Sequence, residues 1–402
     1  MSNSGQNSFS SLTRLLTSCL LVIGLITIWF TAFEVDIIYQ DPLPKRSYTV
    51  GRNQKNYSNG LQTWLVTTAS PNCTTLTLKC TPVQKIVFLK THKTASTTTA
   101  SIFERYGFYR GLKFAVGRTH VLSREKHFNR KNVLKFPLMD GTFDILCNHA
   151  RYNRKEMDVV VPNATYITIL RKPEDQLESA FGYFEMYEGM NITADKNAFK
   201  TFLNDPMKYY KDHKYRLWQL SRNGQLFDLV FDHTNDDNEA DILAKIAQID
   251  HDFDIVMLTE YYDESLILLK RLLCWDFEDI LYFPVGIRSD SHRMAKDKDL
   301  IDKSRKWNHG DVLLYEHFTK VFWSKIEEYG PSFEKDLQKF RNLNKAAFDA
   351  CISLNQTDKK DRREFRLVLK NKTDRCERIF RADVGYTKLI KKTMMKRFKK
   401  SN

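Results

Sequence analysis

The stretch KIVFLKTHKTASTTTASIFERY, at residues 85–106, decides the fold. Its apolar run at 86–89 predicts a buried strand, and a helix is expected to begin near Ser96. The polar turn between them would leave the first backbone N–H groups of that helix unpaired, where they attract an anion. Lys93 adds a positive charge and the hydroxyls of the turn add donors. We therefore expect a loop that binds phosphate or sulfonate.

Further strands are predicted at 143–147, 166–170 and 253–258, with amphipathic helices after 173 and over 263–275. Alternating strands and helices are typical of a largely parallel sheet covered on both faces. His149 follows one strand and Arg171 another, at the edge where such sheets bind ligands. Arg171 and Ser179, two helical turns apart, fit a second phosphate because arginine presents a planar fork of donors.

The N-terminal part predicts a membrane anchor. Residues 15–33 contain no charge and are long enough to cross a bilayer as a helix. Arg14 before this run, with Glu34 and Asp36 after it, favours a cytoplasmic N-terminus and a lumenal body. A cleaved signal peptide is the alternative, but the run is longer than the apolar core of such peptides. Six N-x-Ser/Thr sequons also indicate a secretory compartment. They begin at Asn56, Asn72, Asn163, Asn191, Asn355 and Asn371.

We divide the chain of 402 residues into a cytoplasmic tail (1–14), a transmembrane signal-anchor (15–33), a lumenal stem (34–84), a main domain (85–345) and a basic helical extension (346–402). Of seven cysteines, Cys19 lies in the apolar run, and the others would meet an oxidising lumen. Cys73 and Cys80 are the preferred disulfide pair, because they are close in sequence. The cysteines and histidines lack metal-site spacing, so no metal is expected.

The net charge of +14 would ordinarily suggest nucleic acid as a partner, but a lumenal body argues against it. Much of the excess lies in KLIKKTMMKRFKK at 388–400. Such a run is typical of a solvated or membrane-facing helix. The remaining charge suits a protein that holds a polyanionic nucleotide near a membrane.

Several blocks of the sequence resemble the galactose-3-O-sulfotransferases, and among them the galactosylceramide sulfotransferase type. The blocks are FLKTHKTAS from Phe88, CNHARY from Cys147, ILRKPEDQLESAFGYF from Ile169, EYYDESLILLKRLLCWDFEDILYF from Glu260, and the pair Trp307 and Asn308. The resemblance covers residues 85–323. It implies a P-loop-kinase-like α/β fold and a Golgi enzyme. That enzyme would transfer a sulfonate from 3′-phosphoadenosine 5′-phosphosulfate (PAPS) to the 3-hydroxyl of a terminal galactose.

The same resemblance implies roles for individual residues. The loop would hold the 5′-phosphosulfate, and Arg171 with Ser179 the 3′-phosphate. The loop residues are Thr91, His92, Lys93, Thr94, Ala95, Ser96 and Thr97. The chemistry needs a cation for the leaving phosphate, for which Lys93 is expected, and a base for the galactose hydroxyl. His149 is the preferred base, because imidazole titrates near neutral pH and a strand end faces the ligand. His92, beside Lys93, is the alternative.

Other interpretations stay open at this point. A kinase or NTPase would share the strand, loop and helix, but THKTAS contains no glycine and lacks the G-x-x-x-x-G-K-[ST] spacing. A membrane-anchored glycan-binding protein would explain the apolar run, the sequons and the charge, but not two phosphate-type motifs. Within the sulfotransferase interpretation, the acceptor is a galactose-terminated glycolipid or a glycoprotein glycan.

Overall fold

The computed structural model describes residues 80–211, 217–229, 238–284, 297–353 and 367–399. The predicted anchor at 15–33 and nearly all of the predicted stem lie outside these ranges. So do Cys73 and three of the sequons, at Asn56, Asn72 and Asn355. Within the described ranges, no helix is both long and apolar enough to cross a membrane.

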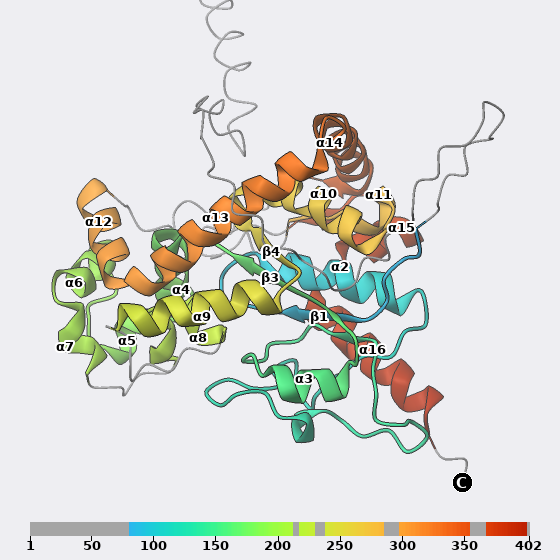
Figure 1. The fold of residues 1–402 in the computed structure, drawn as a ribbon, viewed down its shortest axis with the longest axis horizontal. Coiled ribbons are helices and arrows are strands. Elements are labelled where there is room, and N and C mark those ends of the chain that lie inside the picture. The colour runs from blue at the N-terminus through green and yellow to red at the C-terminus, as the bar shows by residue number, and fades with distance from the viewer. Residues whose placement is uncertain (1–79, 212–216, 230–237, 285–296, 354–366, 400–402) are drawn as a thin grey trace, which may run out of the picture. The chain divides into compact units, whose positions relative to one another are not determined.

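Four parallel strands form the central sheet, in the order β2-β1-β3-β4 (Figure 1). They are β1 (Ile86–Leu89), β2 (Ile145–Leu146), β3 (Thr165–Leu170) and β4 (Ile255–Leu258). Nearly every strand residue is buried, because helices cover both faces and the strands are mostly apolar, with Thr165 and Thr168 of β3 as the exceptions. The expected parallel α/β sheet is confirmed, and each strand falls within or overlaps its predicted range.

Helices surround this sheet, with α2 and α10 on one side of the strands and α3 on the other (Figure 1). The helices that matter for the site are α2 (Ser96–Phe108), α3 (Arg154–Val160), α4 (Pro173–Tyr183), α8 (Gly224–Asp228), α9 (Glu239–Asp252), α10 (Tyr262–Leu273), α12 (Lys298–Trp307), α13 (His309–Tyr329) and α16 (Asp383–Arg397). The predicted helices after 173 and over 263–275 are confirmed as α4 and α10.

The remaining helices and strands are short or lie further from the sheet. They are η1 (Arg130–Asn132), α5 (Met186–Gly189), α6 (Ala198–Asn204), α7 (Pro206–Tyr210), η2 (Trp218–Ser221), η4 (Thr259–Tyr261), α11 (Phe277–Ile280), α14 (Phe333–Cys351), β5 (Ile352–Ser353), β6 (Val368–Leu369) and α15 (Asp374–Phe380). A second apolar core, with Phe181, Phe199 and Phe202 packed together, lies beneath α4 and α6. This second core is separate from the core around the sheet, and the buried apolar residues of α4 belong to it.

The basic C-terminal run is helical, as expected, and its exposed lysines are solvated, but one side of the helix is buried. It belongs to α16, which packs against α2. Tyr386, Ile390 and Met394 recur every four residues along one side of α16 and are buried. The lysines lie between them on the exposed side, so a high local charge concealed an ordinary amphipathic core helix.

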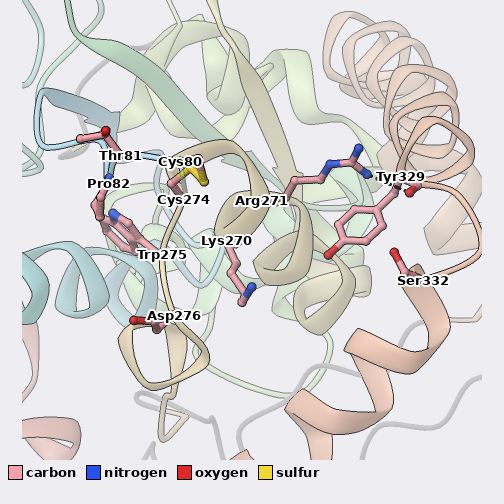
Figure 2. Close-up of a pocket in the computed structure, with 10 residues that line it drawn as sticks. All are labelled: Cys80, Thr81, Pro82, Lys270, Arg271, Cys274, Trp275, Asp276, Tyr329 and Ser332. Carbon is pink, nitrogen blue, oxygen red and sulfur yellow. Dashed lines mark hydrogen bonds between the residues drawn. A yellow bond between two sulfur atoms is a disulfide. The ribbon is translucent and has the colours of Figure 1, made fainter. Parts of the chain in front are cut away.

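Two disulfides are present among the described residues, Cys80–Cys274 and Cys351–Cys376. The expected Cys73–Cys80 pair is therefore wrong. Cys80 pairs with Cys274 because the segment that leads into β1 runs beside the end of α10. There the Val83 N–H donates to the carbonyl of Leu273 (2.9 Å), the residue before Cys274. Figure 2 shows this disulfide at the edge of a surface hollow. None of the residues lining that hollow belongs to the predicted anion loop.

Candidate active site

The loop between β1 and α2 has the sharp turn that an anion cradle requires. Lys93 (φ 62°) and Ala95 (φ 60°) are both left-handed, a conformation that residues other than glycine rarely adopt. No side chain caps the first turn of α2, so its N-terminal N–H groups and the positive end of its dipole face the loop. The predicted start of this helix, Ser96, is confirmed.

The loop hydroxyls brace the loop itself. Thr91 Oγ1 donates to the Ile169 carbonyl of β3 (2.6 Å), and Thr94 Oγ1 lies 2.7 Å from Thr91 Oγ1. The Ser96 hydroxyl donates to the Thr91 carbonyl. From β4's end, Thr259 Oγ1 donates to the Thr94 carbonyl (2.9 Å). These hydroxyls thus hold the strained backbone in place. Backbone N–H groups, Lys93 and the hydroxyl of the half-buried Thr97 are left to bind an anion.

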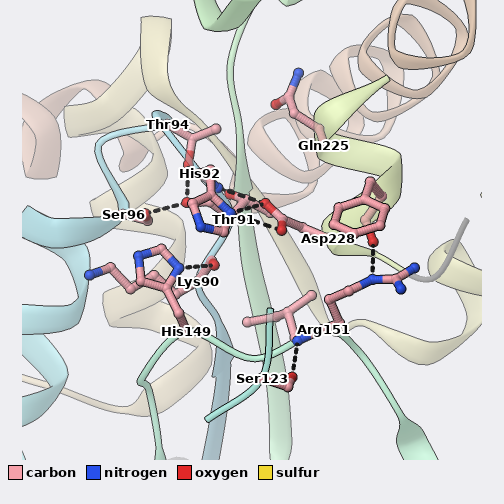
Figure 3. A network of polar contacts seen from close by, with 12 residues as sticks. Lys90, Thr91, His92, Thr94, Ser96, Ser123, His149, Arg151, Gln225 and Asp228 are labelled. Carbon is pink, nitrogen blue, oxygen red and sulfur yellow. Dashed lines mark hydrogen bonds and ion pairs between the residues drawn. The ribbon is translucent and has the colours of Figure 1, made fainter. Parts of the chain in front are cut away.

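His92 is held by Asp228, the last residue of α8 (Figure 3). Its Nδ1 lies 2.9 Å from both carboxylate oxygens of Asp228, and its backbone N–H donates to one of them at 2.7 Å. A carboxylate only accepts, so Nδ1 carries the proton and Nε2 is the nitrogen able to accept another. The Gln176 amide also donates to the His92 carbonyl (3.1 Å).

His149 stacks on His92, with ring centroids 4.3 Å apart. Its Nδ1 donates to the carbonyl of Lys90 (3.0 Å), which again leaves Nε2 able to accept (Figure 3). Burial and the nearby Lys90 ammonium hold the pKa of His149 well below its ordinary value, and the adjoining His92 adds to this effect. His149 is therefore a neutral ring at physiological pH.

Lys93 and Arg171 meet at the open side of the loop. The Lys93 ammonium lies 3.5 Å from the ring centroid of Tyr183, which is 48% exposed at the end of α4. One terminal nitrogen of Arg171 donates to the Lys93 carbonyl (3.2 Å). Gln225 of α8 fixes the backbone of Arg171 by accepting from its N–H (2.8 Å) and donating to its carbonyl (2.9 Å). The guanidinium of Arg171 thus contacts the main chain of the loop residue that carries the Lys93 ammonium.

The sequence is similar to those of known sulfotransferases. The sequence model of the galactose-3-O-sulfotransferases matches residues 47–367. The chain belongs to the galactose-3-O-sulfotransferase family. The resemblance seen in the sequence is thereby confirmed.

Three relatives show the degree of similarity. Galactosylceramide sulfotransferase of Homo sapiens is 36% identical over 277 residues, covering 68% of this chain and 65% of that protein. Galactose-3-O-sulfotransferase 2 of Sus scrofa is 33% identical over 266 residues (62% and 64%). Galactose-3-O-sulfotransferase 3 of Mus musculus is 31% identical over 291 residues (68% and 67%). The matched stretch spans about two thirds of the length of each relative.

Trp307 and Asn308, the pair noted in the sequence resemblance, hold the segment that carries Asp228. Trp307 Nε1 donates to the Ser221 carbonyl (2.6 Å), and the Asn223 N–H donates to Asn308 Oδ1 (2.6 Å). One turn on, Asp311 accepts from the backbone N–H groups of Gln225 (3.1 Å) and Leu226 (2.8 Å). Side chains at the start of α13 therefore hold α8 by its backbone N–H groups.

Gly310 is required for this close approach. A Cβ on Gly310 would lie 2.8 Å from a Leu226 methyl carbon and 3.2 Å from the Asn223 side chain. A side chain at this position would therefore force the Leu226 side chain, or α8 itself, to shift.

The structure brings together most of the residues proposed from the sequence. Lys93, His92, His149 and Arg171 converge at the carboxyl ends of β1, β2 and β3. Ser179 lies within α4 and is 6% exposed, and its contact with the 3′-phosphate stays a prediction. Asp228 and Gln225 were not foreseen, because no local pattern marks them. Among the described residues, no cluster of His, Cys, Asp and Glu could hold a metal ion.

Proposed function

We propose that this chain transfers a sulfonate from PAPS to the 3-hydroxyl of a terminal galactose. The observation that carries this proposal is the His92–Asp228 pair, set in an anion loop beside Lys93. Such a site offers a base and a cation within one short segment. Family membership supports the same activity, since relatives are named as galactosylceramide and galactose-3-O-sulfotransferases.

The donor fits the loop by its charge and shape. The backbone N–H groups at the start of α2 and the Lys93 ammonium would hold the 5′-phosphosulfate of PAPS. Arg171, fixed by Gln225 next to the Lys93 carbonyl, would hold the 3′-phosphate together with Ser179. PAPS supplies the sulfonate when bound, and Lys93 stabilises the negative charge left on the phosphate as the S–O bond breaks.

His92 is our choice for the base, with His149 as its neutral neighbour. In the transfer, the galactose 3-oxygen forms a bond to sulfur and its proton passes to His92 Nε2. Asp228 stabilises the imidazolium that results, as a carboxylate does in a catalytic triad. His149 lacks a carboxylate partner among its described contacts, and burial disfavours its charged form. This ranking differs from the one that the sequence favoured, and both histidines remain testable.

A glycolipid of the galactosylceramide type is the proposed acceptor, in the Golgi lumen, with the chain as a single-pass type II membrane protein. Two disulfides support an oxidising compartment. Three sequons among the described residues, at Asn163, Asn191 and Asn371, are exposed as glycosylation requires. The predicted anchor at 15–33 would keep the site near lipid acceptors.

The test is sulfate transfer by the full chain from labelled PAPS to galactosylceramide, to a galactose-terminated glycopeptide and to free lactose. We expect transfer to the lipid acceptor with the highest kcat/KM, and unchanged activity after addition of a chelator. A preference for the glycopeptide would change the acceptor but not the chemistry. Loss of activity with chelator would instead indicate phosphoryl transfer, which depends on Mg²⁺. Absence of both transfer and adenosine 3′,5′-bisphosphate binding would favour a non-catalytic glycan-binding protein.

A further inference from the structure

The C-terminal helix α16 lies beyond residues 47–367, which match the family, yet it is packed into the core next to the site. One side of α16 is apolar and buried. On that side, the Sδ of Met394 accepts a hydrogen bond from the Phe114 N–H (3.4 Å). Two of its polar residues, Asp383 and Thr387, are also buried. Burial of polar groups is costly unless they are paired. The partners of Asp383 and Thr387 therefore indicate which parts of the site α16 holds in place.

Asp383 pairs with Lys90, the residue that directly precedes the anion loop. The Lys90 ammonium donates to a carboxylate oxygen of Asp383, and the two residues are 4% and 5% exposed. Removing either partner of a buried ion pair leaves an uncompensated charge in the core. The ion pair therefore ties the end of β1 firmly to the first turn of α16.

Lys90 also orients His149. Its carbonyl accepts the Nδ1–H of His149, and this bond sets both the tautomer and the tilt of the ring that stacks on His92. A shift of Lys90 would thus move His149, and with it one wall of the His92 site.

Thr387 is linked to His149 through Asn148, the preceding residue in the chain. Its hydroxyl donates to Glu104 Oε1 of α2 (2.7 Å) and accepts from Asn148 Nδ2 (3.0 Å). Asn148 immediately precedes His149 in the chain. The helix therefore contacts both the residue that accepts from His149 and the residue that leads into it.

We propose that Asp383 and Thr387 of α16 are positioning residues for the transfer reaction, holding His149 against His92 through Lys90 and Asn148. This inference rests on the proposed function. It assigns to the C-terminal helix a share in building the active site.

The experiment compares Asp383→Asn and Thr387→Val with wild type in the full chain. We expect kcat to fall about threefold to tenfold, and no further than in a variant without the His149 ring, because each substitution only displaces that ring. The dissociation constant of adenosine 3′,5′-bisphosphate should change by less than about threefold, since the loop N–H groups and Arg171 are untouched. A helix that only stabilised the fold would lower the melting temperature without this split between kcat and ligand affinity.

The matched control is Lys388→Ala/Lys392→Ala/Lys396→Ala, which removes three exposed charges from the same helix. It should keep wild-type kcat, and an equal loss there would overturn the proposal. If Asp383→Asn does not fold, Lys90→Met/Asp383→Leu removes both buried charges and restores an apolar match. Full kcat in that folded double variant would also overturn the proposal. Failure of the proposed function is distinct, because wild type itself would then not sulfate galactosides.

Discussion

The Asp228 carboxylate accepts two hydrogen bonds from His92, one from the ring Nδ1 (2.9 Å) and one from the backbone N–H (2.7 Å). Asp228 is itself buried, and its helix is anchored by the start of α13. One carboxylate therefore sets the ring orientation and the main-chain position of a loop residue.

Asp228→Asn should lower kcat by about a hundredfold, within the range that a positioned acid–base group contributes. The amide oxygen can still accept from the His92 backbone N–H. Its NH₂ group would then face Nδ1 and favour the tautomer that has the proton on Nε2, which cannot act as base. Steady-state kinetics with labelled PAPS measure the loss.

The matched control for Asp228 is Asp299→Asn, an exposed α12 carboxylate whose described partner is Lys303. It should leave kcat unchanged. Retention of near-normal kcat in Asp228→Asn would show that His92 does not depend on this carboxylate. Such a result would return the role of base to His149.

A direct comparison of His92→Ala with His149→Ala decides between the two rings. We expect the His92 variant to lose about a hundredfold or more in kcat, as for loss of a general base. The His149 variant should lose about tenfold, because the stacking surface that orients His92 disappears. The control is His251→Ala, because the His251 ring is exposed on α9. A larger loss in the His149 variant would contradict our assignment.

Sequence reasoning found the strand, the loop and the first helix because their pattern is local. An apolar run, a polar turn and a helix start lie within one short stretch, and β1 and α2 appear where expected. The partners of this stretch are remote in sequence. Asp228 lies 136 residues from His92, and Asp383 lies 293 residues from Lys90. No periodicity relates positions so far apart, so these residues emerge only from the fold.

The Trp307 and Asn308 pair illustrates a motif that was recognised without its role. Resemblance marked the pair, but only the structure shows that it fixes the segment leading to Asp228. The α9 helix was missed although a signal existed, since the Asn238 side chain accepts from Ala240 and Asp241 at its start.

Tyr183 is expected to hold Lys93 ready for the donor. Tyr183→Leu removes the ring face beneath the ammonium, and exposed cation–π contacts contribute about 0.5–1 kcal/mol. We therefore predict a decrease in kcat of about two- to fivefold. Tyr183→Phe keeps the ring and should match wild type. Equal decreases in both variants would instead assign the effect to the tyrosine hydroxyl.

Asp311 should make stability depend on pH. Burial raises its pKa to about 7, and the nearby Asp228 contributes, although backbone N–H groups of Leu226 and Gln225 oppose the shift. Between about pH 4 and pH 7 the native state keeps a proton that the unfolded state has released. Raising the pH through this window therefore lowers the free energy of unfolding, by an amount on the order of 4 kcal/mol for the whole shift.

Asp311→Asn cannot ionise, so it should lose this part of the pH dependence. We expect the variant to be less stable than wild type at pH 5, because one amide oxygen replaces two acceptors for the N–H groups of Gln225 and Leu226. That difference should narrow or reverse at pH 8, where wild type carries the buried charge. Urea unfolding of both proteins at the two pH values measures the change. A stability difference that stays constant across this range would mean that Asp311 is already ionised at pH 5.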